Sequence, residues 1–132
     1  MKYLLDTNAW IWALDAPERL PKKVRALLHD ADNLPFALAA ISPWEVIKKE
    51  SKGLLQLSVP IRQWVEHATQ APFIELVPLS LDISLESSHL PGAFHKDPAD
   101  QLIVATARVC DLVLISADRR LLDYAHVKTL WK

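Results

Sequence analysis

Residues 2–14 of the chain read KYLLDTNAWIWAL, an apolar stretch that is interrupted by one aspartate. Its first apolar run, from Tyr3 to Leu5, is typical of a short buried strand. Asp6 follows directly, and a helical pattern begins near Ala9. A strand that passes straight into a helix is the repeating unit of α/β folds. The opening therefore predicts an α/β fold with a carboxylate where the first strand ends.

The same alternation of strand and helix patterns continues along the chain. Helical patterns follow four prolines, which suit a first helical position because their missing N–H would be unpaired there: Pro21, Pro43, Pro60 and Pro98. The strand-length runs lack alternation of polar and apolar residues, which favours a parallel sheet covered by helices on both faces. The predicted strands span residues 3–5, 36–41, 74–77, 112–115 and 127–130.

Composition indicates one ordinary globular domain over residues 1–132. Hydrophobic residues make up 51% of the chain, and the net charge of -1 does not by itself suggest nucleic-acid binding. Cys110 is the single cysteine, which excludes an intrachain disulfide and favours a reducing cytoplasm. Asp6 and Asp15 interrupt the apolar start, so we interpret it as a strand and not as a signal peptide. No apolar stretch approaches the roughly 20 residues of a membrane span.

Two carboxylates follow predicted strands that should end at the same edge of the sheet. Asp6 follows the run at 3–5, and Asp118 follows the run at 112–115. Parallel α/β sheets bind ligands beyond the carboxyl ends of their strands, where the strand order reverses. Either acid could instead cap the helix that follows it. Ser116 could take over that capping role or hydrogen-bond a metal ligand.

Two further acids, Glu45 and Asp100, lie at the starts of predicted helices. Glu45 stands three residues after Ser42, which is the spacing of a capping box, and this structural alternative is a serious one. The strand that precedes Glu45 should, however, end at the same sheet edge as the others. In the segment DPAD, Asp97 fits the N-cap position and Asp100 can point back towards that edge. A reciprocal capping box with Asp97 is the alternative for Asp100.

Carboxylates that meet at one edge repel each other, so they must take up protons or bind a metal ion. Hard oxygen ligands suit Mg²⁺, with Mn²⁺ as a substitute, better than they suit zinc. Such an ion polarises a phosphodiester and lowers the pKa of a bound water. The sequence therefore predicts a magnesium site for phosphodiester hydrolysis, with four metal ligands: Asp6, Glu45, Asp100 and Asp118.

Four segments of the chain resemble the PIN-domain family and, within it, the VapC-type toxins of bacterial toxin–antitoxin pairs. The resemblance covers essentially the whole chain and implies a three-layer α/β/α sandwich with a central parallel sheet and a metal-dependent endoribonuclease site. The segments stand in the family's order and spacing: LLDTNAWIW at 4–12, ISPWEVIKK at 41–49, HKDPADQLIVATA at 95–107 and LISADRR at 114–120.

The resemblance also implies roles for individual residues. Asp6 and Asp100 match the principal magnesium ligands of the family, and Glu45 and Asp118 match its remaining acids. Ser116 fills a position that is Thr or Ser in the family, and we count it with the acids as a candidate catalytic residue. Two residues are expected to support the first acid: Thr7 and Asn8.

The implied reaction is hydrolysis of RNA by a metal-activated water, which leaves a 5′-phosphate and a 3′-hydroxyl. The implied partners are the RNA substrate, a cognate antitoxin whose tail blocks the acidic site, and a second copy of the chain in a homodimer. Ala99 and Gln101 stand where the family often has an aromatic residue and an arginine. That departure could alter contacts to RNA or antitoxin, but it leaves the acids intact.

Other residue types carry weaker signals. The histidines, including His95, show no metal-ligand spacing, and we interpret each as a surface or packing residue. Tryptophans are expected in the core, although some could line a groove for a partner helix. Basic residues flank two of the acids and could together hold the RNA backbone, although for any single one a solvated helix face is the favoured interpretation: Lys48, Lys49, Lys52, Arg119 and Arg120.

Two other functions fit the same residues less well. A metal-dependent nuclease of DNA or flap structures would use similar acids, but this short chain lacks the extra helices that clamp a duplex. A non-catalytic PIN-like binding module would keep the fold and use the acids only as helix caps. Metal affinity separates the module from the enzyme, because carboxylates satisfied by backbone N–H groups have no reason to bind Mg²⁺ together.

Overall fold

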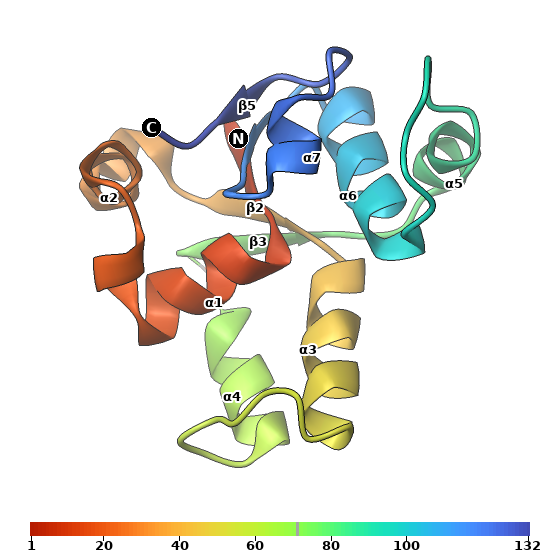
Figure 1. Cartoon of the computed structure of the whole chain (residues 1–132). Coiled ribbons are helices and arrows are strands. Elements are labelled where there is room, and N and C mark those ends of the chain that lie inside the picture. Colours follow the sequence, from red (N-terminus) through yellow and green to blue (C-terminus); the bar gives the residue numbers. More distant parts are fainter. Residues whose placement is uncertain (71) are drawn as a thin grey trace.

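A computed structural model describes residues 1–70 and 72–132 of the chain. Its centre is a five-stranded sheet in which all neighbouring strands are parallel (Figure 1). The strand order β3-β2-β1-β4-β5 places the reversal of order between β1 and β4. The strands are β1 (Tyr3–Leu5), β2 (Phe36–Ala39), β3 (Ile74–Val77), β4 (Val113–Ile115) and β5 (Thr129–Leu130).

Helices connect the strands and cover both faces of the sheet, so the predicted three-layer α/β/α architecture is confirmed (Figure 1). None of the helices in the described part of the chain is long and apolar enough to cross a membrane. The helices are α1 (Thr7–Asp15), α2 (Lys22–His29), α3 (Ile41–Ser51), α4 (Ile61–Ala68), α5 (Leu81–Ser87), α6 (Pro98–Val109) and α7 (Arg119–Leu122), with short 3₁₀ turns at Pro17–Arg19 and Ala31–Asn33.

Alternate strand residues divide the core into two halves, one on each face of the sheet. Leu5 packs in one half with Trp10 and Trp64, whose rings meet edge to face at 5.0 Å. Leu4 packs in the other half, which includes Val104 of α6. Because neighbouring residues of a strand point to opposite faces, a three-residue strand with no polar member is buried on both sides. This explains why β1 shows no alternation in sequence.

Several predicted boundaries and one burial prediction were wrong. The second strand was predicted to reach residue 41, but it ends at Ala39 and α3 begins at Ile41. The fourth and fifth strands begin one and two residues later than predicted, at Val113 and Thr129. The strand β3 was predicted to be buried, yet it lies at the sheet edge and exposes Leu76. Helix α5 was not predicted.

The proline signals for helix starts were largely correct. Pro21 and Pro60 are the N-cap residues of α2 and α4, and Pro98 is the first residue of α6. Pro43 lies in the first turn of α3 and does not start it. Proline is tolerated anywhere in that turn, since those N–H groups have no partner within the helix. A proline therefore indicates a helix start only to within about a turn.

Candidate metal-dependent active site

Asp6 lies at the carboxyl end of β1, at the point where the strand order reverses. Its backbone N–H donates to the carbonyl of Ile115 at the end of β4, which ties the two strand ends together. Its side chain is the N-cap of α1 and accepts a hydrogen bond of 2.8 Å from the N–H of Ala9. The capping alternative is therefore real, and the hydrogen bond uses Oδ1 of Asp6.

Glu45 projects from the second turn of α3 and is held by the opening of α1. Thr7 donates its hydroxyl hydrogen to Glu45 and lies 2.9 Å from the hydroxyl of Ser42. The alternative of a capping box with Ser42 does not hold, because α3 begins at Ile41 and Ser42 is a fully buried residue inside its first turn. The prediction that Thr7 supports Asp6 is also corrected, since the hydroxyl of Thr7 supports Glu45.

Asp100 lies in the first turn of α6, next to an imidazole that the sequence did not single out. The Nε2 atom of His95 lies 2.7 Å from Oδ2 of Asp100, and both side chains are largely buried. Asp97 caps α6 by accepting from the N–H groups of Ala99 and Asp100. The side chain of Asp100 thus takes no part in a capping box within the described contacts. His95, which we interpreted from the sequence as a surface or packing residue, does pack on Phe94, and its ring in addition contacts a predicted metal ligand.

Asp118 follows β4 and is the N-cap of α7, where it accepts from the N–H of Arg120 at 2.9 Å. The guanidinium of Arg120 also contacts two acids, at 3.1 Å from Asp118 and 3.5 Å from Asp100. Ser116 is fully buried, and its hydroxyl accepts from the N–H of Asp118. Ser116 therefore holds the backbone of the Asp118 turn in place.

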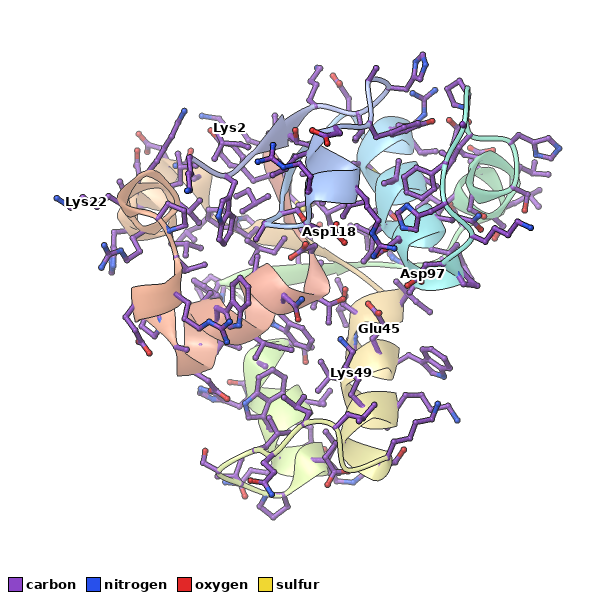
Figure 2. The ribbon with its side chains drawn as sticks, in the orientation of Figure 1. Lys2, Lys22, Glu45, Lys49, Asp97 and Asp118 are labelled. Carbon is purple, nitrogen blue, oxygen red and sulfur yellow. The ribbon has the colours of Figure 1, made fainter. Side chains whose placement is uncertain are left out.

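The four predicted acids line one cavity of about 140 Å³ at the carboxyl edge of the sheet. Asn8, Lys49 and Arg120 also line it. Figure 2 shows where several of these side chains originate: Glu45 and Lys49 on α3, Asp97 at the start of α6 and Asp118 before α7. Segments that are far apart in the sequence thus supply one polar cavity.

Burial and mutual repulsion perturb these carboxylates. Burial raises the pKa of Asp6 to about 6, with Asp100 and Asp118 adding to the effect while Ser116 and Ala9 oppose it. Burial likewise raises the pKa of Glu45 and of Asp100 above their ordinary values. Partial burial also acts to raise the pKa of Asp118, but hydrogen bonds and charge from Arg120 outweigh it, so that pKa is lowered.

The chemistry of these side chains fits a hard divalent cation. All four predicted ligands offer carboxylate oxygens, and the raised pKa of Asp6 indicates a buried negative charge that its surroundings do not balance. No group of three or more potential ligands among the described residues is already arranged to enclose a metal. An open set of carboxylates suits Mg²⁺, which usually keeps several waters and binds one or two protein carboxylates directly.

Residues 3–127 match the family described as the PIN domain, which is nearly the whole chain. The chain belongs to the PIN-domain family. Ribonuclease VapC22 of Mycobacterium tuberculosis is 32% identical to this PIN domain over 130 residues, which cover 97% of each chain. The resemblance to VapC-type proteins that the sequence motifs indicated is thereby confirmed.

Two solved structures have the same fold as this PIN domain. One is VapBC2 from Rickettsia felis bound to a promoter DNA fragment, with a TM-score of 0.71, 17% identity and 100% coverage of both chains. The other is DNA-bound VapBC from Salmonella typhimurium, with a TM-score of 0.74, 17% identity, and coverage of 98% of this chain and 97% of that one. At this identity the likeness shows the fold alone.

The basic and aromatic residues of this PIN domain lie partly where the sequence suggested. Lys49 and Arg120 line the acidic cavity, whereas Arg119 pairs with Asp123 on the exposed side of α7. Trp44 is 53% exposed, beside a small apolar hollow between α3 and α6. His95 could have been found from its place five residues before Asp100, which puts it just ahead of the same helix.

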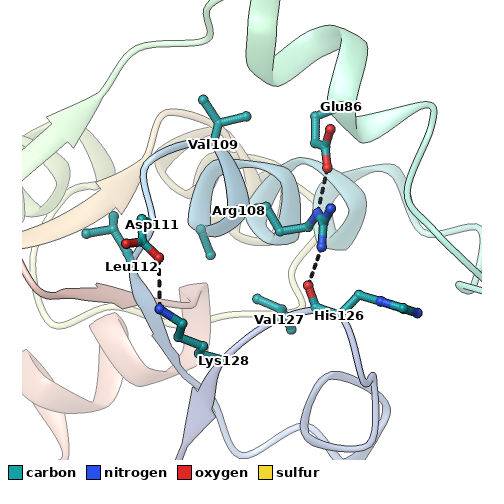
Figure 3. A pocket seen from close by; sticks show the side chains of 9 residues that line it. Glu86, Arg108, Val109, Asp111, Leu112, His126, Val127 and Lys128 are labelled. Atoms are coloured by element: carbon teal, nitrogen blue, oxygen red, sulfur yellow. Dashed lines mark hydrogen bonds and ion pairs between the residues drawn. The ribbon is translucent and has the colours of Figure 1, made fainter.

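A further cavity, of about 390 Å³, lies at the opposite edge of the sheet, where β4 and β5 begin. Figure 3 shows that its charged side chains bind each other: Arg108 bridges Glu86 and the carbonyl of His126, and Lys128 pairs with Asp111. This cavity contains no cluster of like charges. The acidic cavity is therefore the candidate active site of this PIN domain.

Proposed function

We propose that this chain is a Mg²⁺-dependent endoribonuclease and the toxin of a toxin–antitoxin pair. One observation carries the proposal: four carboxylates from separate segments line one cavity, and the most buried of them, Asp6, has a pKa raised to about 6. The name ribonuclease of the Mycobacterium tuberculosis relative supports RNA as the substrate. The raised pKa values support a metal as the missing positive charge.

Asp6 and Asp100 would hold Mg²⁺, with Glu45 and Asp118 as the remaining carboxylates around it. Bound there, the ion would supply charge to polarise a phosphodiester and to lower the pKa of a water, so that hydrolysis leaves a 5′-phosphate and a 3′-hydroxyl. The protein's own contribution is orientation. Thr7 holds Glu45, Ala9 holds one oxygen of Asp6, and Ser116 holds the Asp118 turn.

Basic side chains at the cavity would receive the RNA backbone. Lys49 and Arg120 are the cations that line it. Phosphate contacts of this kind position a strand without reading its sequence. We therefore assign to these two residues the placement of the scissile phosphate beside the acids.

We further propose a cognate antitoxin and a second copy of the chain as partners, acting in the cytoplasm with the RNA substrate. The names of the structural relatives, which are VapBC complexes, support an antitoxin. Exposed apolar side chains support protein partners, because large exposed patches mark interaction surfaces. Such side chains include Trp44 on α3 and Leu81 and Leu85 on α5.

The test is cleavage of short 5′-labelled RNAs of mixed sequence by the purified chain. We expect cleavage with Mg²⁺, none with excess EDTA, recovery when Mg²⁺ is restored, and 5′-phosphates on the downstream products. Asp100→Asn should reduce the rate about 100-fold or more, because it weakens a metal ligand at the reacting centre. Asp111→Asn, which changes an exposed acid at the opposite edge, should cleave like wild type.

Three results would contradict the proposal. Cleavage that persists in EDTA would exclude the metal, and equal cleavage of DNA of the same sequence would favour a DNA nuclease. A folded chain that neither cleaves RNA nor binds Mg²⁺ would favour the non-catalytic binding module. Metal binding can be followed separately by the rise in unfolding temperature, since an ion at 100 times its Kd adds about 2.7 kcal/mol to stability.

A further inference from the structure

A second cavity adjoins the acidic one and has a different lining. It measures about 360 Å³ and lies between residues 92–95, ahead of α6, and residues 123–126, after α7. Arg120 lines both cavities. His95 lines the second cavity and is hydrogen-bonded to Asp100 in the first. The two cavities therefore share a boundary made by the side chains of Arg120 and His95.

Aromatic rings form much of the second cavity, which we call the aromatic pocket. The ring of Phe94 stacks on that of His95, with centroids 4.3 Å apart, and meets Tyr124 edge to face at 4.8 Å. Tyr124 in turn meets the ring of His126 at 5.5 Å. The pocket wall thus contains a connected set of aromatic rings, with the guanidinium of Arg120 at the end next to the acids.

Local contacts hold these rings in place without a ligand. Tyr124 is buried, and its hydroxyl donates to the carbonyl of Pro91, which joins the two segments that flank the pocket. Gly92 has a φ of 68°, and a Cβ built there would lie 3.5 Å from Nε2 of His126. The glycine backbone therefore packs close to that ring. The His126 imidazole points away from the cavity at the opposite sheet edge (Figure 3).

We propose that the aromatic pocket binds a nucleoside of the RNA next to the cleaved phosphodiester. This assignment rests on the proposed ribonuclease function and adds a specificity element to it. A base stacks on aromatic side chains by its flat face, which every base offers. Arg120 at the shared boundary meets the adjoining phosphate, and Asp123 in the pocket wall can accept a hydrogen bond from a base amino group or a ribose hydroxyl.

Other features of the pocket favour a nucleotide over a purely apolar ligand. Polar groups stand around the rings, including His95, Arg120 and Asp123. The hollow beside Trp44, by contrast, is smaller, at about 160 Å³, and is lined mainly by aliphatic side chains. The protein places aromatic rings, the guanidinium of Arg120 and the proposed metal site next to one another in space, in that order. A ligand with a flat apolar part and an anionic part fits this arrangement.

The first test compares steady-state cleavage of a short RNA by variants of an exposed ring. His126→Ala should raise KM about ten-fold with kcat unchanged, because stacking contributes to ground-state and transition-state binding alike. His126→Phe retains a ring and should restore KM. His67→Ala on α4 is the matched control, since it removes an exposed histidine far from the pocket (Figure 1) and should leave both constants unchanged.

The second test measures nucleotide binding in EDTA by amide NMR spectra of the full chain. Cytidine and adenosine 5′-monophosphate should shift the signals of residues 92–95 and 123–126, and His126→Ala should weaken these shifts about ten-fold. Ribose 5-phosphate, which has no base, should not produce them. Equal shifts with ribose 5-phosphate would reduce the pocket to a phosphate site and overturn the proposal.

The two tests separate this assignment from the ribonuclease function. If the chain cleaves RNA with Mg²⁺ while His126→Ala behaves like His67→Ala and nucleotides leave the pocket signals unchanged, the nucleoside site is wrong and the ribonuclease function stands. If the chain cleaves no RNA but the monophosphates shift the pocket signals as described, the ribonuclease proposal fails, and the pocket binds nucleosides without a cleaved phosphodiester beside it.

Discussion

The charged side chains at the two ends of the parallel strands differ in how completely they are paired. At the edge where β4 and β5 begin, Lys128 pairs with Asp111, and Arg108 pairs with Glu86. At the edge where β1 and β4 end, carboxylates outnumber the basic side chains, although Arg120 pairs with Asp118 and Asp100. Among the described residues Asp6 makes no ion pair, and burial has raised its pKa to about 6.

The paired side chains at one end of the strands stabilise the fold, whereas the carboxylates at the other end are available to bind a ligand. Paired groups balance each other, so they have little to gain from an added ion. Uncompensated carboxylates destabilise the folded chain until a cation or a proton reaches them. The carboxyl edge therefore carries a cost in stability that a bound ion would remove, as is common for active sites.

The largest expected effect on stability is at Asp6. The pKa of Asp6 rises from 3.8 in the unfolded chain to about 6 in the folded chain. The contribution of Asp6 to the free energy of unfolding is therefore most favourable below pH 3.8 and is lost as the pH rises through 6. Without metal at pH 8, Asp6→Asn should stabilise the chain by about 3 kcal/mol, at 1.36 kcal/mol per pKa unit. Asparagine caps a helix about as well as aspartate, so the cap is kept.

Urea unfolding of wild type and Asp6→Asn between pH 4 and pH 8 checks this expectation. The stability difference should be small at pH 4 and grow as the pH rises through 6. Excess Mg²⁺ at pH 8 should raise the stability of wild type more than that of the variant. If wild type and Asp6→Asn differ in stability by the same amount at pH 4 and pH 8, the buried charge of Asp6 does not destabilise the folded chain.

A smaller effect of opposite sign is expected at the paired edge. Arg108→Ala removes the bridge between Glu86 and the carbonyl of His126. It should destabilise the chain by about 2 kcal/mol, since hydrogen bonds to charged groups contribute roughly 1.5–3 kcal/mol. RNA cleavage by the folded variant should match wild type. A loss of cleavage without loss of structure would mean that the two edges are coupled.

Thr7→Val tests the support of Glu45 at the carboxyl edge. It removes the hydroxyl that binds Glu45 and Ser42 while nearly keeping the side-chain shape. We expect a loss of about 1 kcal/mol in stability and about a ten-fold fall in cleavage rate, as for other residues that orient metal ligands. Thr7→Ser should recover most of both. Equal activity of the Val and Ser variants would contradict an orienting role.

The smallest effect is expected at the exposed pair of Lys128 and Asp111. Both side chains are mostly exposed, and Lys128 lowers the pKa of Asp111 through a hydrogen bond and its charge. Solvent and salt screen such pairs. Lys128→Ala should leave the unfolding midpoint unchanged at 0.15 M salt and the cleavage rate unchanged. A clear change in the unfolding midpoint or in the cleavage rate would show that this ion pair contributes to stability or to activity.

Local patterns made the site residues predictable one by one. Asp6 follows an apolar strand run directly and Asp118 comes three residues after the end of another, so their place at the carboxyl edge could be predicted from a few neighbouring residues. Asp97 was correctly predicted as an N-cap because it precedes Pro98. The capping-box alternative for Ser42 and Glu45 was wrong, because α3 begins one residue before Ser42. The Ser-x-x-Glu spacing does not show this, and the hydroxyl of Ser42 instead contacts Thr7, 35 residues away.

The alternation of strands and helices, the carboxylates after strands and the family could all be predicted from the amino-acid order, because each depends on short-range periodicity or on the order of motifs. Which groups face each other depends on the folded chain. Contacts such as His95 with Asp100, Arg120 with two acids, and Tyr124 with Phe94 depend on rotamers and on how loops pack. Those contacts set the pKa values and shape the pockets, since burial and charge act through space and not along the chain.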